Sequence, residues 1–315
     1  MKPSIAIVVP CYNEEEILRS TILTLLTTID EMVSENIIDD QKSCLCLVDD
    51  GSKDRTWSII ENHSKNHAKV KGLKLSCNKG HQAALLAGLM DSMEDCDATI
   101  SIDADLQDDP SKIKDMVIFY KQGFEIVFGI RSDRSADSFI KRSLANLFYK
   151  SMIFFGIKIV DGHADFRLIS KKALKELSRY SERSLFLRGM IPLLGFKSAK
   201  IYYPRRKREK GISKYPFRKS LSLAMDGIFS FSFKPLRYIS YIAIFFTMIA
   251  VITLIASITQ FISGNVVPGW TSIIAIITII GAFQLASISI IGEYLGRVYK
   301  EVKRRPHYHI DDRTS

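Results

Sequence analysis

Charged residues are absent from one long stretch of this 315-residue chain. Between Tyr238 and Gly292 there is no Asp, Glu, Lys or Arg over 55 residues, and turn-forming residues interrupt the stretch at 263–270. A soluble core helix seldom stays free of charge on every face for so long. Each half exceeds the roughly 20 apolar residues that cross a bilayer as a helix. We therefore expect two transmembrane helices, at about 239–262 and 270–291, in preference to a buried hairpin in a soluble core.

Cysteine is scarce and scattered, with five residues in the whole chain. Cys44 and Cys46 form a C-x-C pair, but no second Cys or His pair stands at a spacing that would complete a metal site. We therefore expect small buried thiols in a reducing compartment. A signal peptide is not expected either, because acids follow the first short apolar run at once.

Basic residues gather on both sides of the uncharged stretch. Residues 205–219 include eight basic residues and one acid, and residues 297–305 include five and one. The turn between the two expected spans carries no charge, so the positive-inside rule places both flanks in the cytoplasm. We expect an integral protein of the inner (cytoplasmic) membrane, with its large N-terminal domain and both termini cytoplasmic and its basic runs near anionic lipids. A nucleic acid partner is not expected, because the basic runs adjoin the spans and form no separate polar module.

The first 135 residues alternate between short apolar runs and segments of helical periodicity. Apolar runs lie at 4–10, 44–50, 70–76, 98–103 and 125–130, and helical patterns follow the first four of them. This alternation predicts an α/β fold with a mostly parallel sheet covered by helices on both faces. Asn13 is expected to cap the first helix.

Beyond about residue 135, basic residues are interleaved with large apolar ones. Segments at about 137–159 and 213–234 are interpreted as amphipathic helices, which either face the core or lie in the membrane interface. We divide the chain into a cytoplasmic domain with interfacial helices (1–234), a transmembrane hairpin (235–296) and a basic cytoplasmic tail (297–315). His307 and His309 in that tail are expected to be solvated.

Polar clusters follow each of the five expected strands. They read "CYNEEE", "DDGSKD", "NKGHQ", "DADLQDD" and "GIRSD". Ligands of parallel sheets bind at the carboxyl ends of the strands, so these clusters together predict one shared site. A single cluster would be weak evidence, because "DDGS" alone is typical of a plain turn.

Four aspartates crowd into the seven positions of "DADLQDD". Asp103 and Asp105 alternate at a strand end, and hard carboxylate oxygens suit Mg²⁺ or Mn²⁺. Because Mg²⁺ is commonly held by one or two carboxylates together with substrate phosphates, this pair favours a nucleoside diphosphate ligand. For Asp108 and Asp109, capping of the helix after Pro110 is a credible alternative.

Several motifs resemble, in this order and spacing, the catalytic domain of glycosyltransferase family 2. They are "VVPCYNEEE", "LVDDGSKDRT", "NKGHQAALLAGL", "SIDADLQDDP", "GIRSDR" and "DFRLISKKAL". The paired apolar stretches and the ending "GEYLGRVYKEVKRRPHY" resemble the polyprenyl-phosphate glycosyltransferases of that family, the bactoprenol glucosyltransferases and dolichol-phosphate mannose synthases. The resemblance covers nearly the whole chain and implies a GT-A type, Rossmann-like domain. It implies an inverting enzyme that moves one hexose from a nucleotide-sugar, with UDP-glucose favoured, to polyprenyl (undecaprenyl) phosphate. The Q-x-x-R-W motif of processive members is absent, which argues for a single transfer.

The resemblance also implies roles for individual residues. Metal ligands would be Asp103 and Asp105, holding Mg²⁺ or Mn²⁺. The nucleotide-sugar pocket would include Pro10, Tyr12, Asn13, Glu14, Asp49, Asp50, Asp103 and Gln107. Phosphate and acceptor contacts would come from Arg131, Arg167, Arg205, Ser213 and Lys214. Asp165 matches the family's base position, so the expected catalytic residues are Asp105, Asp165 and Arg131.

Three functions remain open from the sequence. A lipid phosphate acceptor is already anionic, so Asp165 would orient groups more than remove a proton. A hydroxyl acceptor such as diacylglycerol or a glycolipid would require Asp165 as a base. A non-catalytic membrane scaffold would be expected to have lost site residues, whereas the D-x-D, the second-strand aspartates and Arg131 are all present. His81 and Gln82 either contact sugar or cap the third helix, and the resemblance is compatible with a homo-oligomer.

Overall fold

The computed structural model describes residues 2–132, 163–180, 182, 186–204, 234–263 and 269–314. The two predicted amphipathic helices, at about 137–159 and 213–234, lie outside these residues except for Lys234. The predicted acceptor contacts Arg205, Ser213 and Lys214 lie outside them as well.

An α/β domain is built on an eight-stranded sheet with strand order β7-β5-β6-β4-β1-β2-β3-β8. Its strands are β1 (Ile5–Cys11), β2 (Cys44–Asp49), β3 (Val70–Leu75), β4 (Ala98–Ser101), β5 (Ile126–Arg131), β6 (His163–Ser170), β7 (Ser198–Tyr203) and β8 (Ile310–Arg313). Its helices are α1 (Leu18–Ser34), α2 (Thr56–Asn66), α3 (His81–Met93), α4 (Lys112–Lys121), α6 (Lys171–Leu177) and α7 (Leu187–Leu193). The five predicted strands and four predicted helices are confirmed, as is the mostly parallel arrangement around β1.

Helices cover both faces of the sheet, which explains why its central strands are apolar throughout. On β1, Ile7 and Val9 pack in a core with α1 and α4, whereas Val8 packs in a second core with α3, α6 and α7. The approach of α3 is close at Gly88, where an added Cβ would lie 2.5 Å from a methyl group of Val8. The sheet and α3 are therefore held in a fixed relation, and α3 carries part of the candidate site at its first turn.

Strand β6 reverses the direction of the sheet and was not predicted. It pairs antiparallel with β4 and β5, with Arg167 opposite Ser101. The start of an antiparallel strand lies beside the end of its neighbour. Asp165 is thereby brought next to the residues that follow β4, including Asp103.

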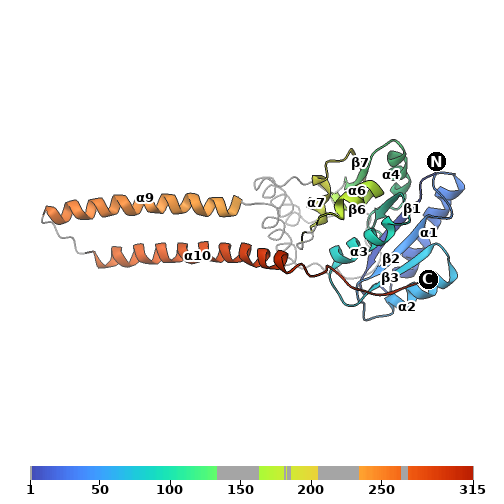
Figure 1. The fold of residues 1–315 in the computed structure, drawn as a ribbon, viewed down its shortest axis with the longest axis horizontal. Helices are drawn as coiled ribbons and strands as arrows, with labels where there is room; N and C mark the ends of the chain where they lie inside the picture. Colours follow the sequence, from blue (N-terminus) through green and yellow to red (C-terminus); the bar gives the residue numbers. More distant parts are fainter. Residues whose placement is uncertain are drawn as a thin grey trace.

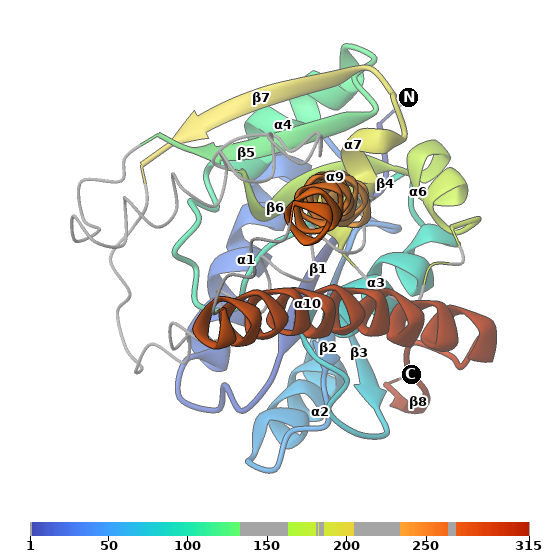
Figure 2. The ribbon, with the colours of Figure 1, turned by 90° about the vertical axis from the view of Figure 1, so that its left-hand side faces the viewer.

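Two long helices extend from one end of the α/β domain (Figure 1). They are α9 (Lys234–Ile262) and α10 (Trp270–Lys303). Figure 2, which looks along α9, shows that the axes of the two helices are not parallel. The helices are in contact at Phe246 and Phe283, whose ring centroids lie 5.0 Å apart. Among the described residues, one helix qualifies as a membrane span by length and composition, Ile279–Lys303. It overlaps the second predicted span, and the first predicted span coincides with α9.

The chain after the second helix differs from the predicted tail. α10 continues through residue 296 to Lys303, and β8 pairs antiparallel with β3 at the edge of the sheet. The backbone N–H of Gly72 donates to Thr314 Oγ1 at 2.7 Å, and the N–H of Ser76 donates to the carbonyl of His309 at 3.0 Å. Residues 310–313 therefore belong to the sheet and not to a separate tail, because they pair with the edge of β3. The domain boundary at 296 stays a prediction, and His309 is exposed, as expected.

Two smaller predictions also need correction. Asn13 does not cap α1: it has φ 53, and its side-chain oxygen accepts the N–H of Lys53 at 2.9 Å, while α1 begins at Leu18. Four cysteines are buried free thiols, as expected, but Cys77 is exposed.

Candidate active site

The acidic loops gather at the carboxyl ends of three adjacent parallel strands. β1, β2 and β4 are neighbours in the sheet. Asp49 ends β2, Asp50 follows it, and Asp103 lies two residues beyond β4. The prediction that these clusters share one edge is borne out by the fold.

Among Asp49, Asp50 and Asp103 at this edge, Asp103 has the pKa that is raised most. Its side chain is two-thirds buried, and its Oδ1 has no hydrogen-bond partner among the described residues. The Nε2 atom of His81 lies 3.6 Å from Oδ1. Burial, reinforced by the nearby carboxylates Asp165, Asp108 and Asp105 and opposed by His81, raises the pKa of Asp103 to about 6. A cation at this carboxylate would offset that repulsion.

Asp105 follows in a tight turn. Leu106 adopts φ 45 and its N–H donates to the carbonyl of Asp103 at 3.2 Å. The N–H of Gln107 donates to Asp105 Oδ1 at 3.3 Å. Thr21 on α1 donates its hydroxyl to the carbonyl of Ala104 at 2.6 Å, which holds the middle of the D-x-D against the core.

Two carboxylates, one of which has an oxygen without a hydrogen-bond partner among the described residues, suit a hard divalent cation. No group of three or more His, Cys, Asp or Glu side chains suited to a metal occurs in the part of the chain that the structure describes. Mg²⁺ tolerates such a site, because it keeps waters and takes the remaining ligands from substrate phosphates. Asp103 and Asp105 would hold the ion together with a bound diphosphate.

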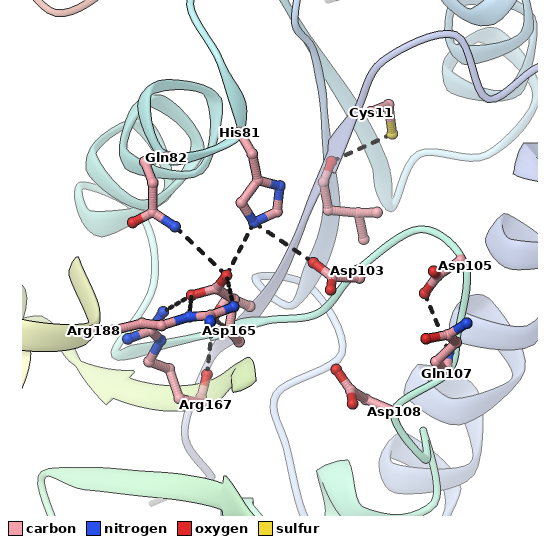
Figure 3. Close-up of polar contacts among 12 residues, drawn as sticks. Cys11, His81, Gln82, Asp103, Asp105, Gln107, Asp108, Asp165, Arg167 and Arg188 are labelled. Atoms are coloured by element: carbon pink, nitrogen blue, oxygen red, sulfur yellow. Dashed lines mark hydrogen bonds and ion pairs between the residues drawn. The ribbon is translucent and has the colours of Figure 1, made fainter. Parts of the chain in front are cut away.

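Asp165 lies at the centre of a cationic cluster (Figure 3). It accepts from Arg188 on α7 at 2.9 Å (Nη2) and 3.3 Å (Nε), and from Arg167. His81 Nε2 lies 3.3 Å and Gln82 Nε2 3.5 Å from its Oδ2. Its backbone carbonyl accepts the hydroxyl of Ser101 on β4. The side chain is therefore held from four directions.

The charges around Asp165 control its protonation. Burial alone would raise its pKa, but Arg188, His81 and Arg167 together hold the pKa well below the ordinary value. A carboxylate this strongly stabilised is a poor proton acceptor at neutral pH. The geometry suits an orienting group better than a general base.

Arg131 is also paired within the site. Its Nε and Nη2 lie 2.8 and 2.7 Å from Oδ1 of Asp108, which is fully buried. Tyr203 on β7 donates its hydroxyl to the same oxygen at 2.7 Å. Asp108 therefore serves to fix Arg131 at the end of β5, and helix capping does not describe its role.

Asp49 and Asp50 have different surroundings, although both are buried. Asp50 accepts the N–H groups of Lys79 and Gly80, at 2.7 and 2.9 Å, and so shapes the loop that leads into α3. Asp49 accepts the N–H of Ser52 at 3.2 Å, and its Oδ2 has no hydrogen-bond partner among the described residues. Burial raises the pKa of both carboxyls.

The remaining predicted pocket residues lie beside Asp49. Pro10 is buried near the end of β1, and Tyr12 is exposed just beyond the strand. The N–H of Asn13 donates to Ser52 Oγ at 3.0 Å, and the N–H of Glu14 donates to Thr56 Oγ1 at 2.9 Å. These bonds join the loop after β1 to the loop after β2.

Sequence reasoning missed Arg188 and left His81 and Gln82 undecided. Arg188 lies on a seven-residue helix, and no motif flanks it. It reaches the site only because α7 packs on the same face as α3, which is a non-local contact. His81 and Gln82 begin α3 and face Asp165, so a position within the site describes them better than a capping role alone.

Comparison with known proteins agrees with this geometry. The family model described as glycosyl transferase family 2 matches residues 6–178. The chain belongs to glycosyl transferase family 2. It is a glycosyltransferase with a GT-A-like α/β fold and a mostly parallel sheet.

Relatives of this glycosyltransferase match over nearly their full length. The chain is 47% identical to the uncharacterized glycosyltransferase YkoT of Bacillus subtilis, over 98% of this chain and 92% of that protein. It is 36% identical to the SfII prophage-derived bactoprenol glucosyl transferase of Shigella flexneri, over 96% of each. Among solved structures, the mannosyltransferase PcManGT from Pyrobaculum calidifontis, in complex with GDP-Man and Mn²⁺, gives a TM-score of 0.48 at 12% identity, over 95% of this chain and 85% of that one.

Proposed function

We propose that this glycosyltransferase moves one hexose from a nucleotide-sugar, with UDP-glucose favoured, to polyprenyl phosphate at the cytoplasmic face of the membrane, and inverts the anomeric centre. The product would be a lipid-linked sugar that serves as donor for a later transfer. The relative named bactoprenol glucosyl transferase, at 36% identity, supports this acceptor class.

The proposal rests on one observation: Asp103 lies between its partner carboxylate Asp105 and an arginine cluster around Asp165 (Figure 3). Asp105 and Gln107 lie on one side of it, and Asp165 with Arg167 and Arg188 on the other (Figure 3). A transfer between two anionic substrates needs two places of positive charge. A metal ion held by Asp103 and Asp105 would provide one for the leaving diphosphate, and the arginines would provide one for the incoming phosphate.

The donor would bind at the ends of β1, β2 and β4. Asp49, with its orphaned buried oxygen, would accept a donor group of the nucleoside, and Tyr12 offers an exposed ring for the base. Asp103 and Asp105 would hold Mg²⁺ or Mn²⁺, which supplies positive charge to the departing diphosphate. Arg131, fixed by Asp108, would add a guanidinium to the same phosphates.

The acceptor needs no general base if it is a phosphate. Its oxygen is already anionic at neutral pH, and Asp165 is held ionised among cations. Asp165 would then orient Arg167 and Arg188 while the phosphate oxygen attacks the anomeric carbon. The role predicted for Arg205, Ser213 and Lys214, which is to close over the phosphates, stays a prediction.

The two long helices would keep the enzyme where its lipid acceptor is. Ile244, Phe245 and Met248 on α9 are about 60% exposed, and Leu285 on α10 is 70% exposed. Large apolar surfaces of this extent mark contact with lipid or another apolar partner. We propose that both helices span the bilayer, with the domain and both chain ends in the cytoplasm. A homo-oligomer is compatible with such a hairpin.

The test is transfer of labelled sugar in detergent from a panel of UDP- and GDP-sugars, with Mg²⁺, Mn²⁺ or chelator. Undecaprenyl phosphate and diacylglycerol are offered as alternative acceptors. The proposal predicts a product on undecaprenyl phosphate, formed only with metal and lost in Asp105→Asn but retained in the nearby control Asp109→Asn. A product on diacylglycerol alone would instead favour a hydroxyl acceptor. Nucleotide binding without transfer to either lipid would point to another acceptor, and the absence of nucleotide binding would favour a non-catalytic scaffold.

A further inference from the structure

Arg188 is the accessible guanidinium of the Asp165 cluster. Its side chain is 34% exposed, whereas Asp165 and Arg167 beside it are buried. The helix that carries it, α7, lies at the end of the α/β domain from which α9 and α10 extend (Figure 1). Arg188 is therefore placed to meet a ligand that arrives from the side of the long helices.

More than one cation shares the carboxylate of Asp165. Two guanidinium groups, from Arg167 and Arg188, contact the single carboxylate of Asp165, and the His81 ring lies beside them. Arg167 is fully buried, and its Nε and Nη1 have no hydrogen-bond partner among the described residues. A buried guanidinium with incomplete pairing favours the approach of an anion.

The start of α3 adds to this positive potential. The 13-residue helix begins at His81 after Gly80, whose N–H donates to Asp50, and within the described residues no side chain caps its first turn. The first N–H groups of a helix and its dipole favour negative charge. His81 presents its ring from this same turn toward Asp165 (Figure 3).

Gln82 joins the two helices that form the cluster. Its Oε1 accepts the N–H of Leu187, the first residue of α7, at 3.2 Å. Its Nε2 lies 3.5 Å from Asp165 Oδ2. One side chain therefore sets where α7 begins and, through Asp165, how the guanidinium of Arg188 is turned.

We propose that Arg188, together with His81 and the first turn of α3, binds the phosphate of the acceptor, and that Asp165 and Gln82 are positioning residues for Arg188. The inference rests on the proposed function, because it assigns a subsite to the acceptor of that reaction. The donor's diphosphate is assigned instead to Asp103 and Asp105, with Arg131. Nε and Nη2 of Arg188 face Asp165, so the phosphate would meet the Nη1–Nη2 edge of the guanidinium. That edge can donate two parallel hydrogen bonds to a phosphate, which a lysine cannot reproduce.

The decisive measurement is the Michaelis constant for each substrate in Arg188→Gln and Arg188→Lys. With undecaprenyl phosphate as acceptor, Arg188→Gln should raise the acceptor KM about 10- to 100-fold, and Arg188→Lys should recover only part of the loss. The donor KM should stay within about twofold of the wild type, because the donor site is a separate set of residues. Arg179→Gln, which alters an exposed arginine paired with Glu176 on the surface, is the matched control and should leave both constants unchanged.

Gln82→Glu tests the positioning role. The glutamate keeps an oxygen for the Leu187 N–H but loses the amide N–H near Asp165 and adds a negative charge there. The acceptor KM should rise while the donor KM and the melting temperature stay close to the wild type. An equal rise in both constants would indicate a merely structural role.

A measurement on the unmodified enzyme covers the case in which a variant fails to fold. Farnesyl phosphate should slow modification of Arg188 by phenylglyoxal, followed by peptide mass spectrometry, whereas farnesol and the nucleotide-sugar should not. Protection by the nucleotide-sugar alone, or a rise in donor KM alone, would assign Arg188 to the donor and overturn the inference.

If the wild type transfers sugar to undecaprenyl phosphate and Arg188→Gln does so with an unchanged acceptor KM, the inference fails while the proposed function stands. If the wild type transfers nothing to this acceptor, both fail.

Discussion

At the scale of single residues, Asp165 combines deep burial with full ionisation. Its side chain is 4% exposed, and its charge is balanced by Arg167 and Arg188. Removal of one partner from a buried ion pair leaves an uncompensated charge, which is costlier than the absence of the whole pair. Asp165 is therefore as much a structural element of the site as a chemical one.

Asp165→Asn separates an orienting role from a base. If Asp165 orients the arginines, the variant should lose about 3–5 kcal/mol of unfolding free energy, because two guanidinium groups lose their counter-charge. Thermal denaturation in detergent measures this as a lower melting temperature. The acceptor KM should rise in the same variant. A collapse of kcat with an unchanged melting temperature and unchanged KM values would instead identify a general base.

Tyr203→Phe tests the support of Arg131. The change removes the hydroxyl that donates to the buried Asp108 at 2.7 Å. We expect a loss of about 1–2 kcal/mol, because Asp108 keeps its ion pair with Arg131. Its neighbour Tyr202 is 60% exposed, so Tyr202→Phe is the control and should leave the melting temperature unchanged. Equal melting temperatures for both variants would contradict the role given to Tyr203.

At the scale of elements, β8 ties the end of the second long helix to the far edge of the sheet. Arg313 pairs with Asp91 on α3 at 3.0 Å, and Tyr308 and Ile310 pack against the core that contains α3. The strand covers the edge of β3 that would otherwise be open. The catalytic domain is thus attached to α10 by backbone pairing as well as by the covalent chain.

Truncation after Pro306 tests this attachment by hydrogen exchange. The amides of Gly72 and Ser76 lose their partners in Thr314 and His309, so peptides that cover residues 70–76 should exchange faster. Peptides that cover β1 should keep their protection, because β1 lies between β2 and β4. Unchanged exchange at 70–76 would show that β8 does not hold the edge in solution.

The sequence predicted those elements whose signal is local. β1 to β5 are short and mostly apolar runs, and α1 to α4 follow the first four of them with helical periodicity, so pattern alone located these elements. β6 and β8 depend on partners more than 60 residues away, as the Ser101–Arg167 and Leu73–Arg313 pairs show. Asp165 could be placed in the site by family resemblance, whereas Arg188 could not be found without the packing of α7.

At the scale of the whole molecule, a polar catalytic domain is joined to two exposed apolar helices. Figure 1 shows that these helices extend away from the sheet. An acceptor with a long apolar tail leaves the bilayer only at a large free-energy cost, about 0.8 kcal/mol for each CH₂ group. If both helices span the bilayer as proposed, the arrangement would keep the site beside such a lipid and within reach of nucleotide-sugar in the water phase.

The native Cys77 provides a test of the orientation. It is the exposed thiol, whereas the other four cysteines are buried. In bacterial cells, a membrane-impermeant maleimide should label Cys77 in inside-out vesicles and not in intact spheroplasts. Ser263→Cys in a Cys77→Ser background should give the reverse pattern, because Ser263 lies at the far end of α9. Labelling of Cys77 in intact spheroplasts would contradict a cytoplasmic domain.

The measurement that tests the central claim most directly is mass spectrometry of the lipid product formed from UDP-glucose and undecaprenyl phosphate by the full-length enzyme. We predict one hexose joined to the lipid phosphate, formed with Mg²⁺ or Mn²⁺, abolished by chelator and restored when metal is added back. Transfer that persists in chelator would contradict the role of Asp103 and Asp105 as metal ligands. The absence of any lipid-linked hexose, with every donor and either metal, would contradict the assignment of a polyprenyl phosphate acceptor.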